Sequence, residues 1–258
     1  MLNYEDIENH FPESIKHQKK YILMEYFQYK ILNILFNLKY SEKIVFIGGT
    51  SLRIIYGTKR FSEDLDFDNF NLSLKEFSDA AYEVKEKLEL EGYNISIETK
   101  NKKNTYHYII KIPKLLYDFN VTPHENQNLT IKVDTQPHNF KYKAEEKLLN
   151  KFGIFTQINV APKDILLSQK IAAALSRKTT KGRDFYDVVF LFGMTQPNYD
   201  YLKDKLKVRN IKELKELLLE KCENIDFKTL EKDTKPFLFN TSDIIMISRF
   251  KDYIKGLN

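Results

Sequence analysis

The feature that most constrains this chain is the stretch from Ile47 to Asp68, where a glycine turn is followed by closely spaced carboxylates. Lys43–Ile47 predicts a short buried strand, and Thr50–Tyr56 predicts a helix that starts directly after the turn. Glycine lets the backbone approach a ligand closely, and the first N–H groups of a helix attract anions. An ordinary strand-to-helix turn also uses glycine. The turn is therefore a candidate phosphate site, made of Gly48, Gly49, Thr50 and Ser51.

The second half of this stretch, Asp64–Asp68, fits the two-residue period of a strand. Its three aspartates then share one face, and Leu65 and Phe67 share the other. Like charges so close repel one another, so the face is either solvated or neutralised by a hard cation such as Mg²⁺. A solvated edge strand is the alternative interpretation. The neighbouring phosphate-cradling turn favours a metal site at Asp64 and Asp66.

The turn and the carboxylates together resemble a known motif. Gly48-Gly49-Thr50-Ser51 followed by Asp64-Leu65-Asp66 looks like the first motif of the polymerase-beta-like nucleotidyltransferases. More narrowly, the letters GGTSLRIIYG and RFSEDLDF resemble the AbiEii/AbiGii toxins, the nucleotidyltransferase-like toxins of type IV toxin–antitoxin and abortive-infection systems. The recognisable segments run from about Val45 to Leu191. The resemblance implies an α/β (α+β) fold, with a nucleotidyltransferase-like mixed sheet, flanking helices and a helical C-terminal half.

A later strand offers a third carboxylate. Leu129–Asp134 alternates apolar and polar residues, which predicts a strand with Asp134 on its polar face at the end. The resemblance implies that a strand beside the Asp-x-Asp strand supplies such a residue, and Asp134 is the one we assign. It would complete a metal set of Asp64, Asp66 and Asp134. The alternative is a strand-ending aspartate before a turn at Gln136-Pro137.

Two further segments match the family pattern. Pro162–Arg177 predicts a helix in which Lys170 lies among small and apolar residues, and the resemblance implies that Lys170 binds the triphosphate. A surface lysine is the alternative. Asp184 and Asp187 share the face of a following helix, where acids often only cap the first turn. The resemblance favours a direct role for Asp184, places Arg183 in the nucleotide site, and leaves Asp187 to brace the basic loop of residues 177–183.

The rest of the chain predicts the elements that surround this site. Amphipathic helices are expected at His17–Leu38 and at Leu72–Glu91, the latter bounded by Asn71. Strands are expected at Tyr93–Lys100 and Thr105–Ile112, joined by a turn at Asn101–Asn104. We expect an α/β catalytic domain over residues 1–150 and a mostly helical domain over residues 151–258 that completes the cleft.

Composition narrows the class of protein. Forty-two percent hydrophobic residues are ample for the core of a soluble globular protein. A net charge of +5 permits a polyanionic partner without demanding one. Cys222 is the only cysteine, and no signal peptide or membrane-length apolar run is visible, so we expect a cytoplasmic protein without disulfides. The histidines show no zinc-ligand spacing.

These observations predict a Mg²⁺-dependent nucleotidyltransferase that uses a nucleoside triphosphate and a two-ion site. The resemblance implies a nucleic-acid acceptor, with the 3′ end of tRNA as the candidate, and a cognate antitoxin that need not touch the toxin. A small-molecule nucleotidyltransferase and a catalytically silent nucleotide- or RNA-binding module are the alternatives; a phosphohydrolase is a third.

Overall fold

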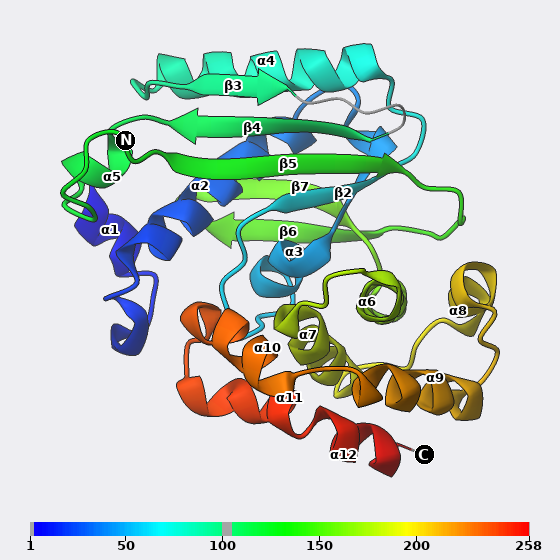
Figure 1. Cartoon of the computed structure of the whole chain (residues 1–258). Coiled ribbons are helices and arrows are strands. Elements are labelled where there is room, and N and C mark those ends of the chain that lie inside the picture. Colours follow the sequence, from blue (N-terminus) through cyan, green and yellow to red (C-terminus); the bar gives the residue numbers. More distant parts are fainter. Residues whose placement is uncertain (1–2, 100–104, 258) are drawn as a thin grey trace. The chain divides into compact units, whose positions relative to one another are not determined.

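The computed structural model describes residues 3–99 and 105–257 (Figure 1). The chain forms two compact units. Unit 1 comprises Met1–Gly57 and Phe61–Val160, and unit 2 comprises Thr58–Arg60 and Ala161–Asn258. The expected turn at Asn101–Asn104 lies outside the described residues. No helix in the described part of the chain is both long enough and apolar enough to cross a membrane.

Unit 1 is built on a seven-stranded mixed sheet with the strand order β3-β4-β5-β2-β1-β7-β6. β1 pairs with β7 and β2 with β5 in parallel, and the other neighbours are antiparallel. The expected mixed α/β fold is thereby confirmed. The strands are β1 (Ile44–Ile47), β2 (Leu65–Asn69), β3 (Ser96–Thr99), β4 (Tyr106–Ile112), β5 (Leu129–Pro137), β6 (Glu145–Lys151) and β7 (Ile154–Val160).

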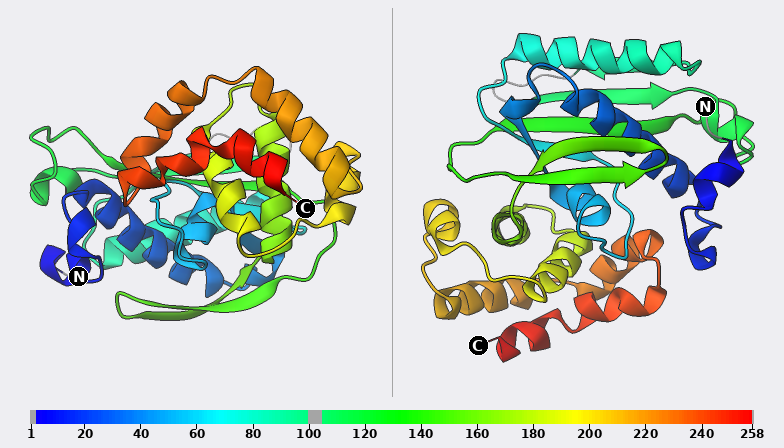
Figure 2. Two further views of the ribbon diagram at one scale, coloured as in Figure 1. Left: turned by 90° about the horizontal axis from the view of Figure 1, so that it is seen from below. Right: turned by 180° about the vertical axis from the view of Figure 1, so that it is seen from behind.

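Helices of unit 1 lie on both faces of the sheet, with the two long ones, α2 and α4, on the same face (Figures 1 and 2). On one face, α2 packs along β5 and β7, and α4 packs along β3 and β4. α3 contacts β1 and β2, on the face that carries Asp66. Because Phe67 meets Phe36 of α2, the two faces of β2 differ as its alternation predicts. The helices are α1 (Tyr4–Glu8), α2 (Lys19–Phe36), α3 (Gly48–Ile54), α4 (Leu74–Leu90) and α5 (Leu115–Asp118).

Two expected element ends need correction. The N-cap of α4 is Ser73, not Asn71, because Ser73 and Glu76 form a reciprocal capping box. Asn71 instead has a positive φ of 69° in the turn before the helix. Asp134 does not end its strand either, because β5 continues to Pro137 in register with β2. Asp134 therefore lies inside the sheet and not in a turn.

The hairpin β6–β7 was absent from our sequence interpretation. Its turn is formed by Phe152 (φ 58°) and Gly153 (φ 73°), and positive φ is unusual for a bulky residue. The Phe152 ring is buried and packs edge-on against Tyr26 and Tyr29 of α2, which fixes the turn. The expected domain boundary at residue 150 falls inside β6, whereas the units divide between Val160 and Ala161.

Unit 2 is helical in its described residues apart from one bridge between Arg60 and Leu238. α7 packs closely on α10, since a Cβ on Gly182 would lie 2.3 Å from Oγ1 of Thr234. Arg60 belongs to this unit although it stands only four residues before Asp64. The α-helices are α6 (Lys163–Ser176), α7 (Gly182–Phe192), α8 (Tyr199–Leu206), α9 (Ile211–Glu223), α10 (Phe227–Thr234), α11 (Ile245–Ser248) and α12 (Phe250–Gly256).

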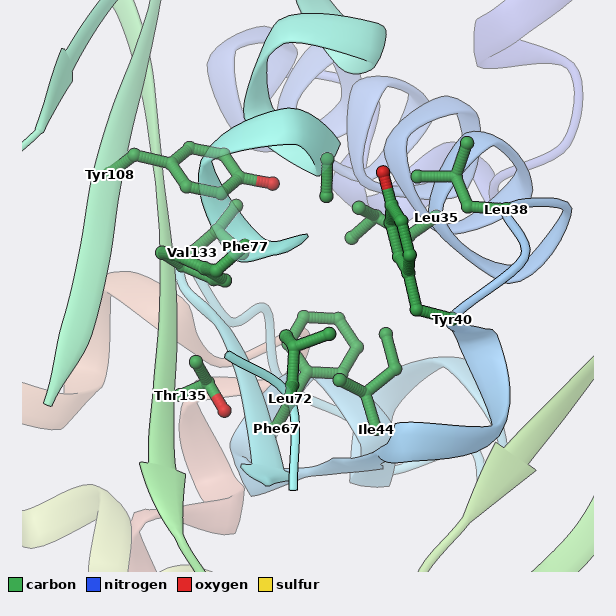
Figure 3. A pocket seen from close by; sticks show the side chains of 11 residues that line it. Leu35, Leu38, Tyr40, Ile44, Phe67, Leu72, Phe77, Tyr108, Val133 and Thr135 are labelled. Carbon is green, nitrogen blue, oxygen red and sulfur yellow. The ribbon is translucent and has the colours of Figure 1, made fainter. Parts of the chain in front are cut away.

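The apolar face of the sheet in unit 1 encloses a small cavity of about 20 Å³ between α2, α4 and the strands. Figure 3 shows the Tyr108 hydroxyl turned toward this space, with Thr135 on the sheet side. Both residues are almost fully buried. The lining is almost entirely apolar, so the cavity is a packing gap of the core.

Candidate active site

The glycine turn is fitted closely to the first carboxylate strand. Gly48 has a φ of 79°, and a Cβ at this position would lie 2.2 Å from Oδ2 of Asp66. A side chain is thus excluded both by backbone conformation and by lack of space. α3 begins at Gly48 itself, so the main-chain N–H groups of its first turn stand beside the Asp66 carboxylate.

The two hydroxyls of the turn donate hydrogen bonds to main-chain carbonyls. Oγ1 of Thr50 donates to the carbonyl of Asp64, and Oγ of Ser51 donates to the carbonyl of Gly48 at 2.9 Å. Both residues are fully buried. These bonds attach α3 to the residue before β2 and close the turn. The predicted contact of either hydroxyl with phosphate stays a prediction, whereas the N–H groups are the donors that a helix start offers to an anion.

The sheet brings the predicted carboxylates onto one face. Asp66 of β2 and Asp134 of β5 are direct partners in a parallel register, so their side chains project to the same side. Asp64 comes immediately before β2 and shares this side by the two-residue period. We call the side that carries these three residues the carboxylate face. All three are half-buried.

Asp64 and Asp134 carry charges of the same sign on the carboxylate face. Burial raises the pKa of Asp134, and the negative charge of Asp64 raises it further, while His107 and Lys132 oppose the shift. Within residues 3–99 and 105–257, neither Asp64 nor Asp134 has a side-chain hydrogen bond or a salt bridge. A divalent cation would relieve this repulsion, and carboxylate oxygens are the ligands that hard cations prefer.

The donor set therefore fits a hard metal ion chemically. The described side chains nevertheless include no ready-made group of three or more His, Cys, Asp or Glu residues spaced to hold one. The three aspartates share a face without converging on one point. A bound ion would be held by Asp64, Asp66 and Asp134 after small side-chain rotations, which remains a prediction.

The other predicted residues form a buried ionic network in unit 2. Nζ of Lys170 lies 2.9 Å from Asp187 and 3.5 Å from Asp184, so Lys170 is ion-paired and does not extend freely into solvent. Asp187 is completely buried and binds Arg60 with both oxygens, at 2.7 and 2.5 Å. Burial opposes the charge of Asp187, but Arg60 and Lys170 outweigh it and lower the pKa of that carboxyl.

Asp184 and Arg183 have separate surroundings in the same unit. Asp184, and not Asp187 as expected, holds the basic loop, because Nη1 of Arg177 binds its carboxylate at 2.5 Å. The guanidinium of Arg183 stacks on Phe237 at 4.2 Å from the ring centroid. Asp184 is 2% exposed, and its carboxylate forms ion pairs with Arg177 and Lys170. The nucleotide roles predicted for Lys170, Arg183 and Asp184 stay predictions.

Sequence reasoning missed the roles of Arg60 and Asp68. Arg60 was visible in the quoted letters RFSEDLDF, but no local pattern pairs it with a residue 127 positions later. Asp68 lies on the carboxylate face, yet its oxygens are bound by Tyr142 at 2.5 Å and by Nδ1 of His138 at 3.0 Å. Asp68 thus anchors a loop, unlike Asp64 and Asp66.

A glycine turn at a helix start, beside an Asp-x-Asp strand and a third carboxylate strand, defines the class of nucleotidyltransferase-like folds. The chain belongs to the AbiEii family, described as the nucleotidyl transferase AbiEii toxin of a type IV toxin–antitoxin system, whose profile matches residues 30–251. The match extends beyond the segments recognised in the sequence, and it confirms the suspected family. Family membership assigns the chain to the nucleotidyltransferase toxins.

Solved structures show the same fold at low identity. JHP933 from Helicobacter pylori has a TM-score of 0.55 and 19% identity, and the alignment covers 91% of each chain. A second H. pylori protein, provisionally assigned as a nucleotidyltransferase, has a TM-score of 0.53 and 19% identity, covering 96% of this chain and 99% of the other. Curated proteins give no match. At this identity the structures support the fold and carry no residue roles.

Proposed function

We propose that this protein transfers a nucleotide from a nucleoside triphosphate to an RNA acceptor, with the 3′ end of tRNA as the candidate, and depends on Mg²⁺. The observation that carries the proposal is the register of Asp66 with Asp134, beside a Gly48 that has no room for a side chain. A binding module has no need for carboxylates side by side on adjacent strands, whereas metal-dependent phosphoryl transfer does.

The residues of unit 1 have distinct roles in this reaction. The N–H groups of the turn at Gly49 and Thr50 bind the triphosphate oxygens, because a helix start offers donors to phosphate. Asp64, Asp66 and Asp134 hold the divalent cations, with two ions proposed. When bound, Mg²⁺ lowers the pKa of the attacking hydroxyl and neutralises charge on the phosphates. The acceptor hydroxyl would then form a bond to the α-phosphorus and release its proton to solvent, while the bond from that phosphorus to the bridging oxygen breaks and pyrophosphate leaves.

The decisive experiment uses the full chain, total tRNA and each labelled nucleoside triphosphate in turn, with Mg²⁺ or with EDTA. We expect incorporation of label that EDTA abolishes and that the double variant Asp64→Asn, Asp66→Asn loses. Asp79→Asn, an exposed aspartate on α4, is the matched control and should keep full activity. Unchanged incorporation in the double variant would refute the metal assignment.

The same experiment distinguishes the rival functions. Incorporation into small molecules in a cell extract, with none into RNA, would establish the small-molecule alternative. Retention of RNA without incorporation of any nucleotide would establish a silent binding module. In the toxin–antitoxin setting of the family, we also propose that expression of the active protein arrests growth and that a cognate antitoxin relieves the arrest.

A further inference from the structure

The loop between β5 and β6 carries a basic and aromatic sequence that the proposed reaction does not use. Its residues, His138 to Ala144, read HNFKYKA, with lysines at 141 and 143. Basic residues interleaved with aromatic ones are typical of surfaces that bind nucleic acid. A binding site also requires that the loop be held close to the reacting end of the RNA.

The loop is fixed to the carboxylate strand. The hydroxyl of Tyr142 donates to Oδ2 of Asp68 at 2.5 Å, and Nδ1 of His138 lies 3.0 Å from Oδ1 of the same residue. The rings of His138, Tyr142 and Phe70 also pack together, with centroids 5.2 to 5.4 Å apart. Asp68 is 4% exposed, so its charge is committed to these partners. The loop is therefore held by contacts at two of its residues.

This anchoring puts the loop beside the candidate active site. Asp68 follows Asp66 by two residues on the same face of β2, which corresponds to a separation of about 7 Å. This separation is about two steps of 3.4 Å, the rise between stacked nucleotides along one strand. A strand whose reacting end meets Asp66 would thus bring its next phosphates to the loop.

The two lysines of the loop are available for such phosphates. Lys141 and Lys143 are exposed, and neither has an ion pair within the described residues. The acidic residue that follows, Glu145, is paired with Lys147 at 2.7 Å. Phe140, directly before Lys141, is partly buried.

We propose that the β5–β6 loop binds the sugar–phosphate backbone of the RNA acceptor next to its reacting end, with Lys141 and Lys143 contacting phosphates. The proposal rests on the proposed function in taking the acceptor to be RNA. Tyr142 acts as a positioning residue, because its bond to Asp68 keeps the loop next to the carboxylate face.

The test measures the binding of a fluorescent single-stranded RNA to the full chain across a range of salt concentrations. The variant Lys141→Gln, Lys143→Gln is compared with Lys75→Gln, Lys87→Gln on α4, which carries the same charge change. α4 packs on the opposite face, because Phe77 and Ala80 line the cavity beside Phe67 and Val133. We expect the loop variant to reduce the slope of log K against log salt by about 1.4, since each phosphate contact contributes about 0.7. The control slope should equal that of the wild type.

Equal slopes for the loop variant and the wild type, or no RNA binding by the wild type, would overturn the proposal. Tyr142→Phe should weaken RNA binding less than the double lysine variant, and it should lower the thermal unfolding temperature modestly, because the buried Asp68 carboxylate loses one hydrogen-bond donor. RNA binding that depends on the lysines but comes with no nucleotide incorporation would refute the transfer reaction and leave the loop assignment intact. The two proposals therefore fail separately.

Discussion

Both units contain aspartates removed from solvent, but the charges around these aspartates differ. Cations surround the aspartate of unit 2, whereas another carboxylate lies near the aspartate of unit 1. In unit 2, Asp187 is fully buried, yet Arg60 and Lys170 match its charge, and the pKa of its carboxyl is lowered. In unit 1, Asp134 is only half-buried, yet it faces Asp64 without a salt bridge within the described residues, and its pKa is raised. A matched network stabilises a fold, whereas unmatched carboxylates are a reason to bind a cation.

The largest expected effect is on activity, when a carboxylate of unit 1 is removed. Asp66→Asn should lower nucleotide incorporation by about 10²- to 10³-fold, because charge stabilisation in the transition state is lost. The thermal unfolding temperature should change little, because asparagine nearly matches aspartate in size and shape. Steady-state incorporation assays and thermal melts provide both readouts. A variant that keeps full activity would show that this face is not the active site.

Removing a charge from unit 2 should instead affect folding. Asp187→Asn leaves the guanidinium of Arg60 buried without its partner, which costs about 3–5 kcal/mol of unfolding free energy. Asp204→Asn is the matched control in α8, because its ion pair with Lys205 is exposed and is expected to contribute less than about 1 kcal/mol. Urea denaturation measures both variants. Equal losses in the two would contradict the structural role assigned to Asp187.

Two glycines of unit 1 with the same backbone conformation test whether the glycine turn is fitted to Asp66. Gly48 (φ 79°) and Gly57 (φ 74°) both have positive φ, but only a Cβ on Gly48 would meet Asp66. Gly57→Ala should cost about 1 kcal/mol of stability through backbone strain and leave activity intact. Gly48→Ala should cost more and also lower nucleotide incorporation, because it displaces the Asp66 carboxylate. Equal activity in the two variants would argue against a fitted turn.

The smallest expected effect is on the pH dependence of stability, measured in EDTA. Asp187 and Asp134 should contribute to it with opposite signs. The lowered pKa of Asp187 contributes stability that is fully present above 3.8, the ordinary value, and is lost as the pH falls through its lower folded value. The raised pKa of Asp134 does the reverse, because its charge begins to destabilise the folded state above 3.8, the ordinary value, and does so fully above the raised value.

The matched variants isolate these two contributions. Asp134→Asn should therefore unfold at a slightly higher temperature than the wild type near neutral pH, and the difference should vanish below about pH 3.8. Asp187→Asn should show its largest deficit at neutral pH and a shrinking deficit in acid. Melting curves from pH 3 to 7 (about one unit apart) test both signs. A destabilised Asp134→Asn in EDTA would mean that this carboxylate is already compensated.

Local patterns were sufficient for the part of unit 1 that carries the glycine turn and the first carboxylates. The strand, the turn and the helix around Gly48 follow from apolar residues, glycines and a two-residue alternation, and these are properties of neighbouring residues. The same alternation placed Asp64 and Asp66 on one face. The pairing of Asp66 with Asp134 was only implied by family resemblance, because strand order is set by packing across 68 positions of the chain.

The sequence by itself thus determined the helix-forming turn, the spacing of its carboxylates and the family, because these depend on contiguous residues. Only the tertiary structure decided which charges are matched. Phe152 turns a hairpin at a positive φ because α2 supplies aromatic neighbours, and Asp187 is a structural residue because Arg60 reaches it from far along the chain. Neither partner is visible locally, since burial and long-range pairing arise only when distant segments pack together.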